Sequence, residues 1–251
     1  MEHNATARRL IIASRILARD AERLEFAAPV RYVYNPLVYA RVPYEMYLAR
    51  FAAGPKRVVF LGMNPGPWGM AQTGVPFGEV TAVKEWMGIS GDVKAPAGTH
   101  PRVPVHGFSC SRSEVSGARL WALLRDEFGP ATRMARDVFV SNYCPLMFLD
   151  EEGRNLTPDK IGKPDQSALF EVCDRYLASV IAALRPEWLV GVGRFAEHRL
   201  RGCVGTSGYA GARVTSITHP SPANPRAHND WAGQVSAALV RDGVWMRPEK
   251  D

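Results

Sequence analysis

The sequence predicts an α/β protein built as three layers, α/β/α, around a central, mostly parallel four-stranded sheet. Four short runs of mainly β-branched and aromatic residues are bounded by Gly, Pro or polar residues, as buried strands usually are. Amphipathic helical patterns lie between these runs, and strands that alternate with helices form parallel sheets covered on both faces. The composition, with 46% hydrophobic and 22% charged residues among 251, is that of a globular protein.

The predicted elements follow from these patterns in chain order. The strands are residues 57–63, 138–142, 188–192 and 214–218. The helices are residues 5–28, 114–128 and 167–184, each followed within two residues by Pro, and a last one from 229 or 230 to 240. No repeat, low-complexity run or linker divides the chain. We therefore expect one domain, residues 1–251, with the N-terminal helix (about residues 5–28) packed on it and residues 94–113 as a long internal connection.

The charge balance favours a polyanionic partner. The net charge is +6 and the sequence pI is about 9.3, and basic proteins often bind DNA or RNA, although many bind neither. No apolar run is long enough to span a membrane, and the N-terminus lacks the layout of a signal peptide. We expect a soluble cytoplasmic protein with no membrane partner, nucleoid-associated in a bacterium or nuclear in a eukaryote, and a monomer.

Four cysteines raise the question of a metal centre. Cys110, Cys144, Cys173 and Cys203 contain no CxxC pair and no Cys/His pair at zinc spacing. An iron–sulfur cluster is the alternative, but close cysteine pairs are its usual signature. We expect reduced thiols in the core, no metal or iron–sulfur cluster, and no cofactor.

Polar side chains occur where the predicted strands end. Asn64 follows the first strand, Asn142 ends the second and His219 follows the fourth. Ligands of open parallel sheets bind at the carboxyl ends of the strands, so these residues are expected to meet in one site. Each alone has a simpler interpretation: Asn64 could bond its own turn, and His219 could be structural.

Two rigid segments support that site. In Gly62–Pro67 the prolines restrict the turn, and Gly66 lets backbone approach a ligand closely. Phe77, between Pro76 and Gly78, is poorly placed for ordinary core packing and well placed to stack on a planar base.

These segments resemble motifs of the single-strand-selective monofunctional uracil-DNA glycosylases. The run GMNPGPWGMAQTGVPFGEV at residues 62–80 is similar to their first motif, and His-Pro-Ser-Pro at 219–222 is similar to their second. Asn-Tyr-Cys-Pro-Leu at 142–146 resembles the segment that holds their base-reading Asn, and Ser-Glu-Val-Ser-Gly-Ala-Arg at 113–119 also matches. The likeness covers roughly residues 32–231.

The resemblance implies roles for matching residues. Asn64 would orient the hydrolytic water, and His219 would hydrogen-bond uracil O2 and stabilise charge on the leaving base. Phe77 would stack on the flipped base, and Asn142 would read its Watson–Crick edge. The backbone from Gly66 to Met70 would line the side near C5.

The implied activity is a DNA-repair glycosylase that flips uracil out of single- or double-stranded DNA and hydrolyses its N-glycosidic bond. The matching motifs contain no Lys, so water is the expected nucleophile and no lyase step should follow. Whether 5-hydroxymethyluracil or other deaminated or oxidised bases are also substrates stays open. An alternative is a non-catalytic nucleic-acid- or damage-binding protein on the same fold.

The loop after His219 is the candidate DNA-contacting segment, with Ser221, Pro222, Ala223 and Arg226 as candidate residues. Relatives carry Arg directly after His-Pro-Ser-Pro, whereas this chain has Ala223, with Arg226 three residues later as a substitute. Strand preference and the residue that fills the gap left by the base stay open.

A dinucleotide-binding interpretation rests on Gly191-Val192-Gly193-Arg194-Phe195-Ala196, which fits GxGxxA after a predicted strand. That fingerprint expects an acidic residue at the end of the next strand. The next strand instead leads to His219, so this interpretation is the weaker one.

Overall fold

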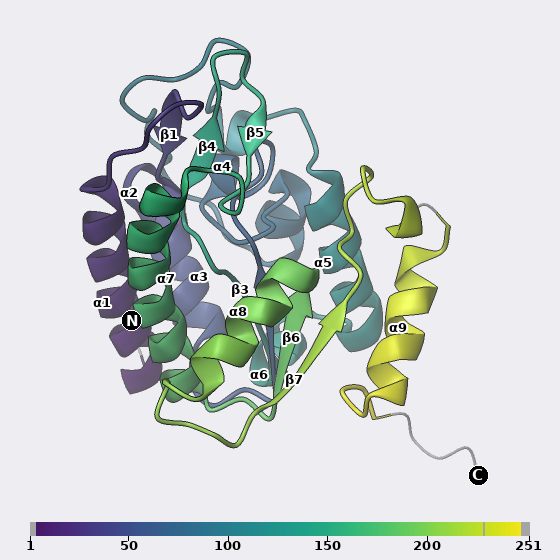
Figure 1. Cartoon of the computed structure of the whole chain (residues 1–251). Helices are drawn as coiled ribbons and strands as arrows, with labels where there is room; N and C mark the ends of the chain where they lie inside the picture. Colours follow the sequence, from purple (N-terminus) through teal and green to yellow (C-terminus); the bar gives the residue numbers. More distant parts are fainter. Residues whose placement is uncertain (1–3, 228, 247–251) are drawn as a thin grey trace.

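A four-stranded parallel sheet forms the centre of the computed structural model, which describes residues 4–227 and 229–246 (Figure 1). The strand order is β3-β2-β6-β7, and all neighbours are parallel. The strands are β2 (Val58–Gly62), β3 (Val138–Asn142), β6 (Trp188–Val192) and β7 (Arg213–Ile217). Each predicted run is therefore a strand whose ends differ from the prediction by at most one residue.

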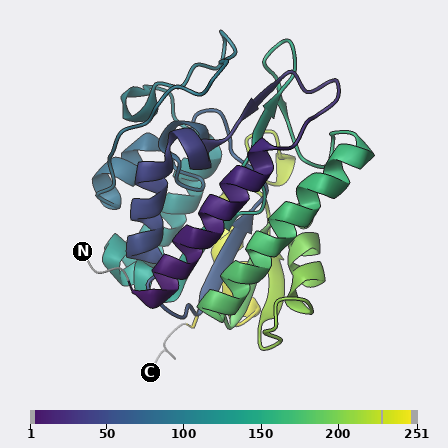
Figure 2. The same cartoon turned by 90° about the vertical axis from the view of Figure 1, so that its left-hand side faces the viewer.

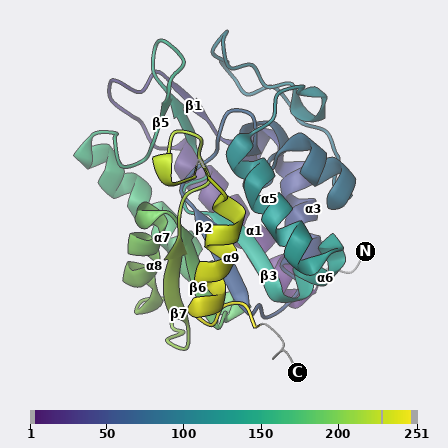
Figure 3. The same ribbon diagram turned by 90° about the vertical axis from the view of Figure 1, so that its right-hand side faces the viewer.

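Helices cover both faces of this sheet, which confirms the predicted three layers (Figures 1 and 3). One side carries α1 (Ala5–Glu22), α7 (Lys163–Leu184) and α8 (Arg194–Val204), and the other carries α5 (Val115–Phe128) and α9 (Trp231–Arg241). The remaining helices are α2 (Pro36–Tyr39), α3 (Arg41–Phe51), α4 (Met70–Thr73) and α6 (Ala131–Asp137). Single helical turns occur at Ala82–Trp86, Gly107–Ser109 and Pro225–Ala227. None of the described helices is long and apolar enough to cross a membrane.

A tyrosine from α3 covers the free edge of β3. The Tyr47 hydroxyl donates to Val140 O (2.8 Å) and accepts from Val140 N–H (3.1 Å). Edge strands with unpaired backbone groups invite pairing with other chains. Here the buried Tyr47 hydroxyl satisfies the backbone N–H and C=O of Val140, which a further strand would otherwise bond.

Helix α1 is shorter than predicted, because the chain leaves the helix at Glu22 and not at residue 28. The Phe26 ring packs on Phe148 with centroids 4.8 Å apart. The Ala27 N–H donates to Asp165 Oδ2 (2.8 Å). These tertiary contacts, invisible in a local pattern, draw residues 23–28 out of the helical path.

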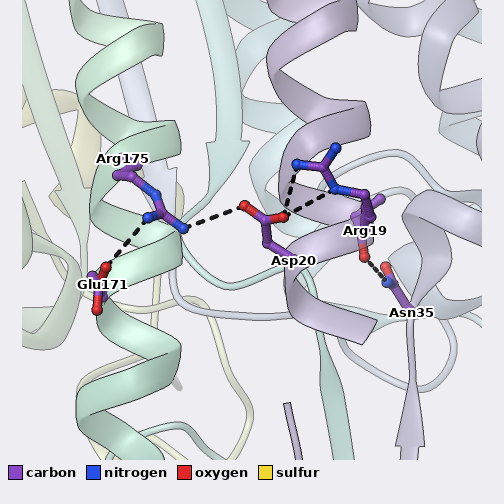
Figure 4. Close-up of polar contacts among 6 residues, drawn as sticks. Arg19, Asp20, Asn35, Glu171 and Arg175 are labelled. Carbon is purple, nitrogen blue, oxygen red and sulfur yellow. Dashed lines mark hydrogen bonds and ion pairs between the residues drawn. The ribbon is translucent and has the colours of Figure 1, made fainter. Parts of the chain in front are cut away.

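Helices α1 and α7 run side by side over one face of the sheet (Figure 2). Arg175 on α7 links them, with one guanidinium nitrogen 3.3 Å from Asp20 and another 3.2 Å from Glu171 (Figure 4). Nearby, the Asn35 side chain donates to Ala18 O (3.0 Å). The ion pairs are solvent-accessible and contribute little, so buried apolar contact holds α1 in place.

A second, antiparallel sheet was not predicted. Its order is β1-β4-β5, from β1 (Tyr32–Tyr34), β4 (Met147–Leu149) and β5 (Asn155–Leu156). Strands of two or three residues are too short for an alternating pattern to be recognised. This sheet lies beyond the carboxyl ends of the parallel strands (Figure 1).

Candidate active site

A cavity of about 350 Å³ opens at the carboxyl edge of the parallel sheet. Its lining includes seven residues named from the sequence: Asn64, Gly66, Met70, Phe77, Asn142, His219 and Ser221. These come from segments far apart in the chain, which the parallel strands bring to one edge.

The amide of Asn142 and the ring of Phe77 both lie against Gly62, at the end of β2. Gly62 on β2 pairs with Asn142 on β3. A Cβ on Gly62 would lie 2.4 Å from both Asn142 Oδ1 and Phe77 Cε2. Glycine is therefore required at the end of β2, because both side chains lie against its backbone.

Asn142 is 7% exposed and has one unsatisfied amide atom. Its Nδ2 lies 3.3 Å from Met70 Sδ, a weak acceptor. Its Oδ1 is buried and has no hydrogen-bond partner among the described residues. A buried acceptor without a donor is unfavourable, so this amide is suited to a ligand that offers an N–H group.

Phe77 has a positive φ of 54°, unusual for an aromatic residue. Trp121 on α5 donates Nε1–H to Phe77 O (3.0 Å), and a Cβ on Gly117 would lie 2.1 Å from that same oxygen. The ring is 9% exposed and belongs to the core, contrary to the expectation that it packs poorly there. It nevertheless lines the cavity, because the strained backbone turns it toward Gly62.

The side-chain nitrogen of Asn64 has two backbone acceptors, Pro65 O (3.5 Å) in its own turn and Leu146 O outside that turn. Asn64 Nδ2 donates to Leu146 O (3.3 Å), which comes from the chain after β3. That chain continues alongside the residues after β2, with Tyr143 N–H bonded to Gly62 O and Cys144 N–H bonded to Met63 O. The amide is thus oriented by tertiary structure, which leaves its Oδ1 available as an acceptor at the cavity.

The geometry around His219 selects one tautomer. Ser221 N–H donates to His219 Nδ1 (3.1 Å), so the proton of the neutral ring lies on Nε2. Burial lowers the pKa of His219 from 6.5, which favours the neutral ring. The following loop is tied to α5, because Arg119 Nη1 donates to Pro220 O (2.9 Å).

The other candidate DNA-contacting residues lie beyond the cavity. Pro222 and Ala223 are exposed, and Ala223 N–H donates to Ser221 Oγ (3.2 Å). The backbone of Arg226 belongs to the turn Pro225–Ala227, and its side chain lies outside the described part of the structure.

The glycines of the dinucleotide-like segment have packing roles. A Cβ on Gly191 would lie 2.4 Å from Glu197 N, so the glycine lets α8 approach the sheet. Gly193 has φ 91°, and a Cβ there would lie 3.4 Å from His219 Cβ. Both glycines therefore serve the packing of α8 beside His219.

Several residues of the site were not assigned from the sequence. Glu114, the N-cap of α5, Ser116 in its first turn, Asn155 in β5 and Thr157 just after β5 also line the cavity. Glu114 falls in the matched segment 113–119, which was the signal that could have identified it. All four cysteines are buried free thiols, and in residues 4–227 and 229–246 no three His, Cys, Asp or Glu side chains could hold a metal ion.

Known proteins resemble this chain over most of its length. Residues 50–238 match the model of the uracil DNA glycosylase superfamily. The chain is 45% identical over 232 residues to the single-strand selective monofunctional uracil-DNA glycosylase of Rattus norvegicus, covering 91% of this chain and 82% of that protein. It is 45% identical over 225 residues to the protein of the same name from Bos taurus, covering 90% and 82%.

A solved structure supports the fold. The crystal structure of wild-type Pedobacter heparinus SMUG2 superimposes with a TM-score of 0.63 over 92% of this chain and 98% of that one, at 17% identity. The match to the superfamily model and the 45% identity to these relatives show that the chain belongs to the single-strand-selective monofunctional uracil-DNA glycosylases, within the uracil-DNA glycosylase superfamily.

Proposed function

We propose that this protein removes uracil from DNA by hydrolysing the N-glycosidic bond, and that it leaves an abasic site. The observation that carries the proposal is the convergence of Asn64, Phe77, Asn142 and His219 on one cavity. The relatives named above are monofunctional uracil-DNA glycosylases by name, which supports the same activity here.

Asn142 is the proposed reader of the base. Uracil presents an N3–H donor beside the O4 acceptor, which suit the buried Oδ1 and the Nδ2 of one amide. Cytosine reverses both groups and would meet two mismatches, which can give large discrimination. Phe77 is the proposed stacking ring, and the base reaches it only after flipping out of a duplex.

His219 is the proposed stabiliser of the leaving base. Breaking the glycosidic bond leaves negative charge on uracil, and its O2 would accept from the Nε2–H that the Ser221 contact fixes. Losing one preorganised donor of this kind typically lowers the rate by about 10²- to 10³-fold.

Asn64 is the proposed orienter of the water. Its amide is held at Nδ2 by Pro65 O and Leu146 O, so Oδ1 can accept a hydrogen bond from the attacking water. Among the described residues that line the cavity there is no lysine to form a Schiff base, so we expect base removal without strand scission.

The wider assignments follow from the same proposal. The net charge of +6 suits DNA as a partner. We propose that Ser221, Pro222, Ala223 and Arg226 contact the strand around the flipped base.

We also propose a single-domain monomer over residues 1–251, acting in the compartment that holds the DNA: the cytoplasm or nucleoid in a bacterium, the nucleus in a eukaryote. The size of the base accepted beside Gly66 and Met70 is measured with the uracil and 5-hydroxymethyluracil oligonucleotides of the next subsection.

The test is a cleavage assay on end-labelled oligonucleotides that carry one uracil, either single-stranded or paired with G or A. Each sample is divided between alkali and no alkali. Strand breaks that require both uracil and alkali, and that disappear in Asn64→Ala and fall by orders of magnitude in His219→Leu, are expected. Breaks without alkali would contradict the monofunctional chemistry.

Absence of cleavage in every uracil context would overturn the proposed substrate. A panel of deaminated and oxidised bases would then separate another glycosylase specificity from the alternative, a non-catalytic binding protein. A thermal-shift screen with NAD and NADP checks the dinucleotide interpretation, and no stabilisation is expected.

A further inference from the structure

The carboxyl group of Glu114 lies along the segment of residues 66–69 at the cavity wall. Trp68 N–H donates to Glu114 Oε2 (3.1 Å). A Cβ on Gly66 would lie 2.4 Å from Glu114 Oε2, and one on Gly69 would lie 3.0 Å from Glu114 Cγ. Two glycines therefore leave room for this side chain, and the amide between them is bonded to it.

This carboxyl group is poorly explained by stability alone. Glu114 is partly buried, forms no ion pair within the described residues, and burial raises its pKa. The nearby Arg112 guanidinium lies over the Trp68 ring, 3.9 Å from its centroid. Burying a carboxylate without a cation is unfavourable, which points to a role in the cavity that it lines.

The segment bonded to Glu114 continues to Met70, which contacts Asn142, the proposed base-reading residue. Two residues after Trp68, Met70 lies 3.3 Å from Asn142 Nδ2 through its sulfur. Gly66 and Met70 both line the cavity. A displacement of residues 66–70 would therefore change the room beside the base and the contact of the Asn142 amide together.

We propose that Glu114 is a positioning residue that holds residues 66–70 against the cavity and so limits the size of the C5 substituent on the bound pyrimidine. This inference rests on the proposed function, because it assigns the specificity of the same site. Without the acceptor at residue 114, the segment moves away from the base and larger C5 substituents fit.

The test compares Glu114→Met, which keeps the length but removes the acceptor, with Glu114→Gln, which keeps an acceptor for Trp68 N–H. Glu127→Met, on an exposed turn of the same helix, is the matched control. Single-stranded oligonucleotides carry uracil or 5-hydroxymethyluracil, and kcat and KM are measured for both. The quantity compared is kcat/KM for 5-hydroxymethyluracil divided by kcat/KM for uracil. We expect this ratio to be about tenfold higher in Glu114→Met than in the wild type, and to stay within about threefold of the wild type in Glu114→Gln.

Residue-resolved hydrogen exchange gives a readout that does not depend on activity. The Trp68 amide should exchange faster in Glu114→Met and at the wild-type rate in Glu114→Gln and Glu127→Met, since only the first loses the acceptor. If Glu114→Met does not fold, Gly66→Ala tests the same contact from the other side, and it should shift the substrate ratio in the same direction.

Failure of this inference differs from failure of the proposed function. An active wild type whose substrate ratio is unchanged in Glu114→Met and in Gly66→Ala overturns the inference alone. Unchanged exchange at Trp68 in Glu114→Met overturns it as well. A wild type that is inactive on uracil overturns the proposed function, and with it the specificity assigned to Glu114.

Discussion

The indole Nε1–H of Trp121 donates a 3.0 Å hydrogen bond to the carbonyl oxygen of Phe77, whose φ is 54°. This bond joins the middle of α5 to a strained residue of the cavity wall. Strain of this kind persists only where surrounding contacts hold it. The direction of the Phe77 ring thus depends on a helix that contributes no part of the first or second sequence motif.

Trp121→Phe should therefore weaken base capture. Phe keeps an aromatic ring at this buried position, but the bond to Phe77 O is lost and the backbone of Phe77 can relax toward negative φ. We expect KM for a uracil oligonucleotide to rise about tenfold with a smaller change in kcat. Steady-state kinetics check this, with Trp86→Phe as control, since that indole bonds to Gly129 O away from the cavity. Equal KM values in the two variants would contradict the role of the bond.

Gly62→Ala should nearly abolish activity while the protein stays folded. The added methyl would overlap both Asn142 Oδ1 and the Phe77 ring, so the amide that reads the base and the ring that stacks on it would both be displaced. A displacement of about 1 Å can lower a rate about 10²-fold. Single-turnover rates measure the loss. Gly202→Ala in α8, where a Cβ meets nothing within 4 Å, is the control and should keep full activity.

The activity should persist below pH 6.5 and then fall as His219 becomes protonated. Burial lowers the pKa of His219 below 6.5 in the folded protein, so the neutral ring, with its proton on Nε2, dominates down to that lower value. The stability of the folded protein depends on pH in the same direction. Because the pKa of His219 is higher in the unfolded chain, the unfolded chain takes up this proton at a higher pH than the folded protein does. The contribution of His219 to the free energy of unfolding is therefore complete above pH 6.5 and is lost as the pH falls toward the folded pKa.

The measurement is a pH profile of single-turnover rate together with thermal unfolding of wild type and His219→Gln. Between pH 7 and the pKa of His219 in the folded protein, the Tm of the wild type should fall by more than the Tm of His219→Gln. An acidic limb of the rate profile centred above pH 6.5 would show that another group controls activity.

Asn142→Asp should relax the discrimination between uracil and cytosine. Residue 142 is buried, so the pKa of the new carboxyl should be raised, and its protonated form can donate to cytosine N3 and accept from N4. Excision of cytosine should appear and should increase as the pH is lowered. Product analysis on matched uracil and cytosine oligonucleotides checks it. Loss of uracil activity with no gain on cytosine at any pH would mean that Asn142 does more than read this edge.

The parallel sheet and the residues gathered at its carboxyl edge could be predicted from the sequence alone. Buried parallel strands are continuous apolar runs, and a residue that follows such a run must lie at the carboxyl edge whatever the strand order. Asn64, Asn142 and His219 could be named for this reason. Gly66 and Phe77 could be named because each lies next to proline in a rigid segment, and the motif likeness added Met70.

Only the tertiary structure decided how those residues are held. The tautomer of His219 depends on the Ser221 amide, the orientation of Asn64 on Leu146 O, and the direction of Phe77 on Trp121. The end of α1, the second sheet and the place of Glu114 beside residues 66–69 likewise depend on distant contacts. Local patterns report burial and periodicity along the chain, whereas a hydrogen bond between segments many residues apart exists only once packing has brought its two atoms within about 3 Å.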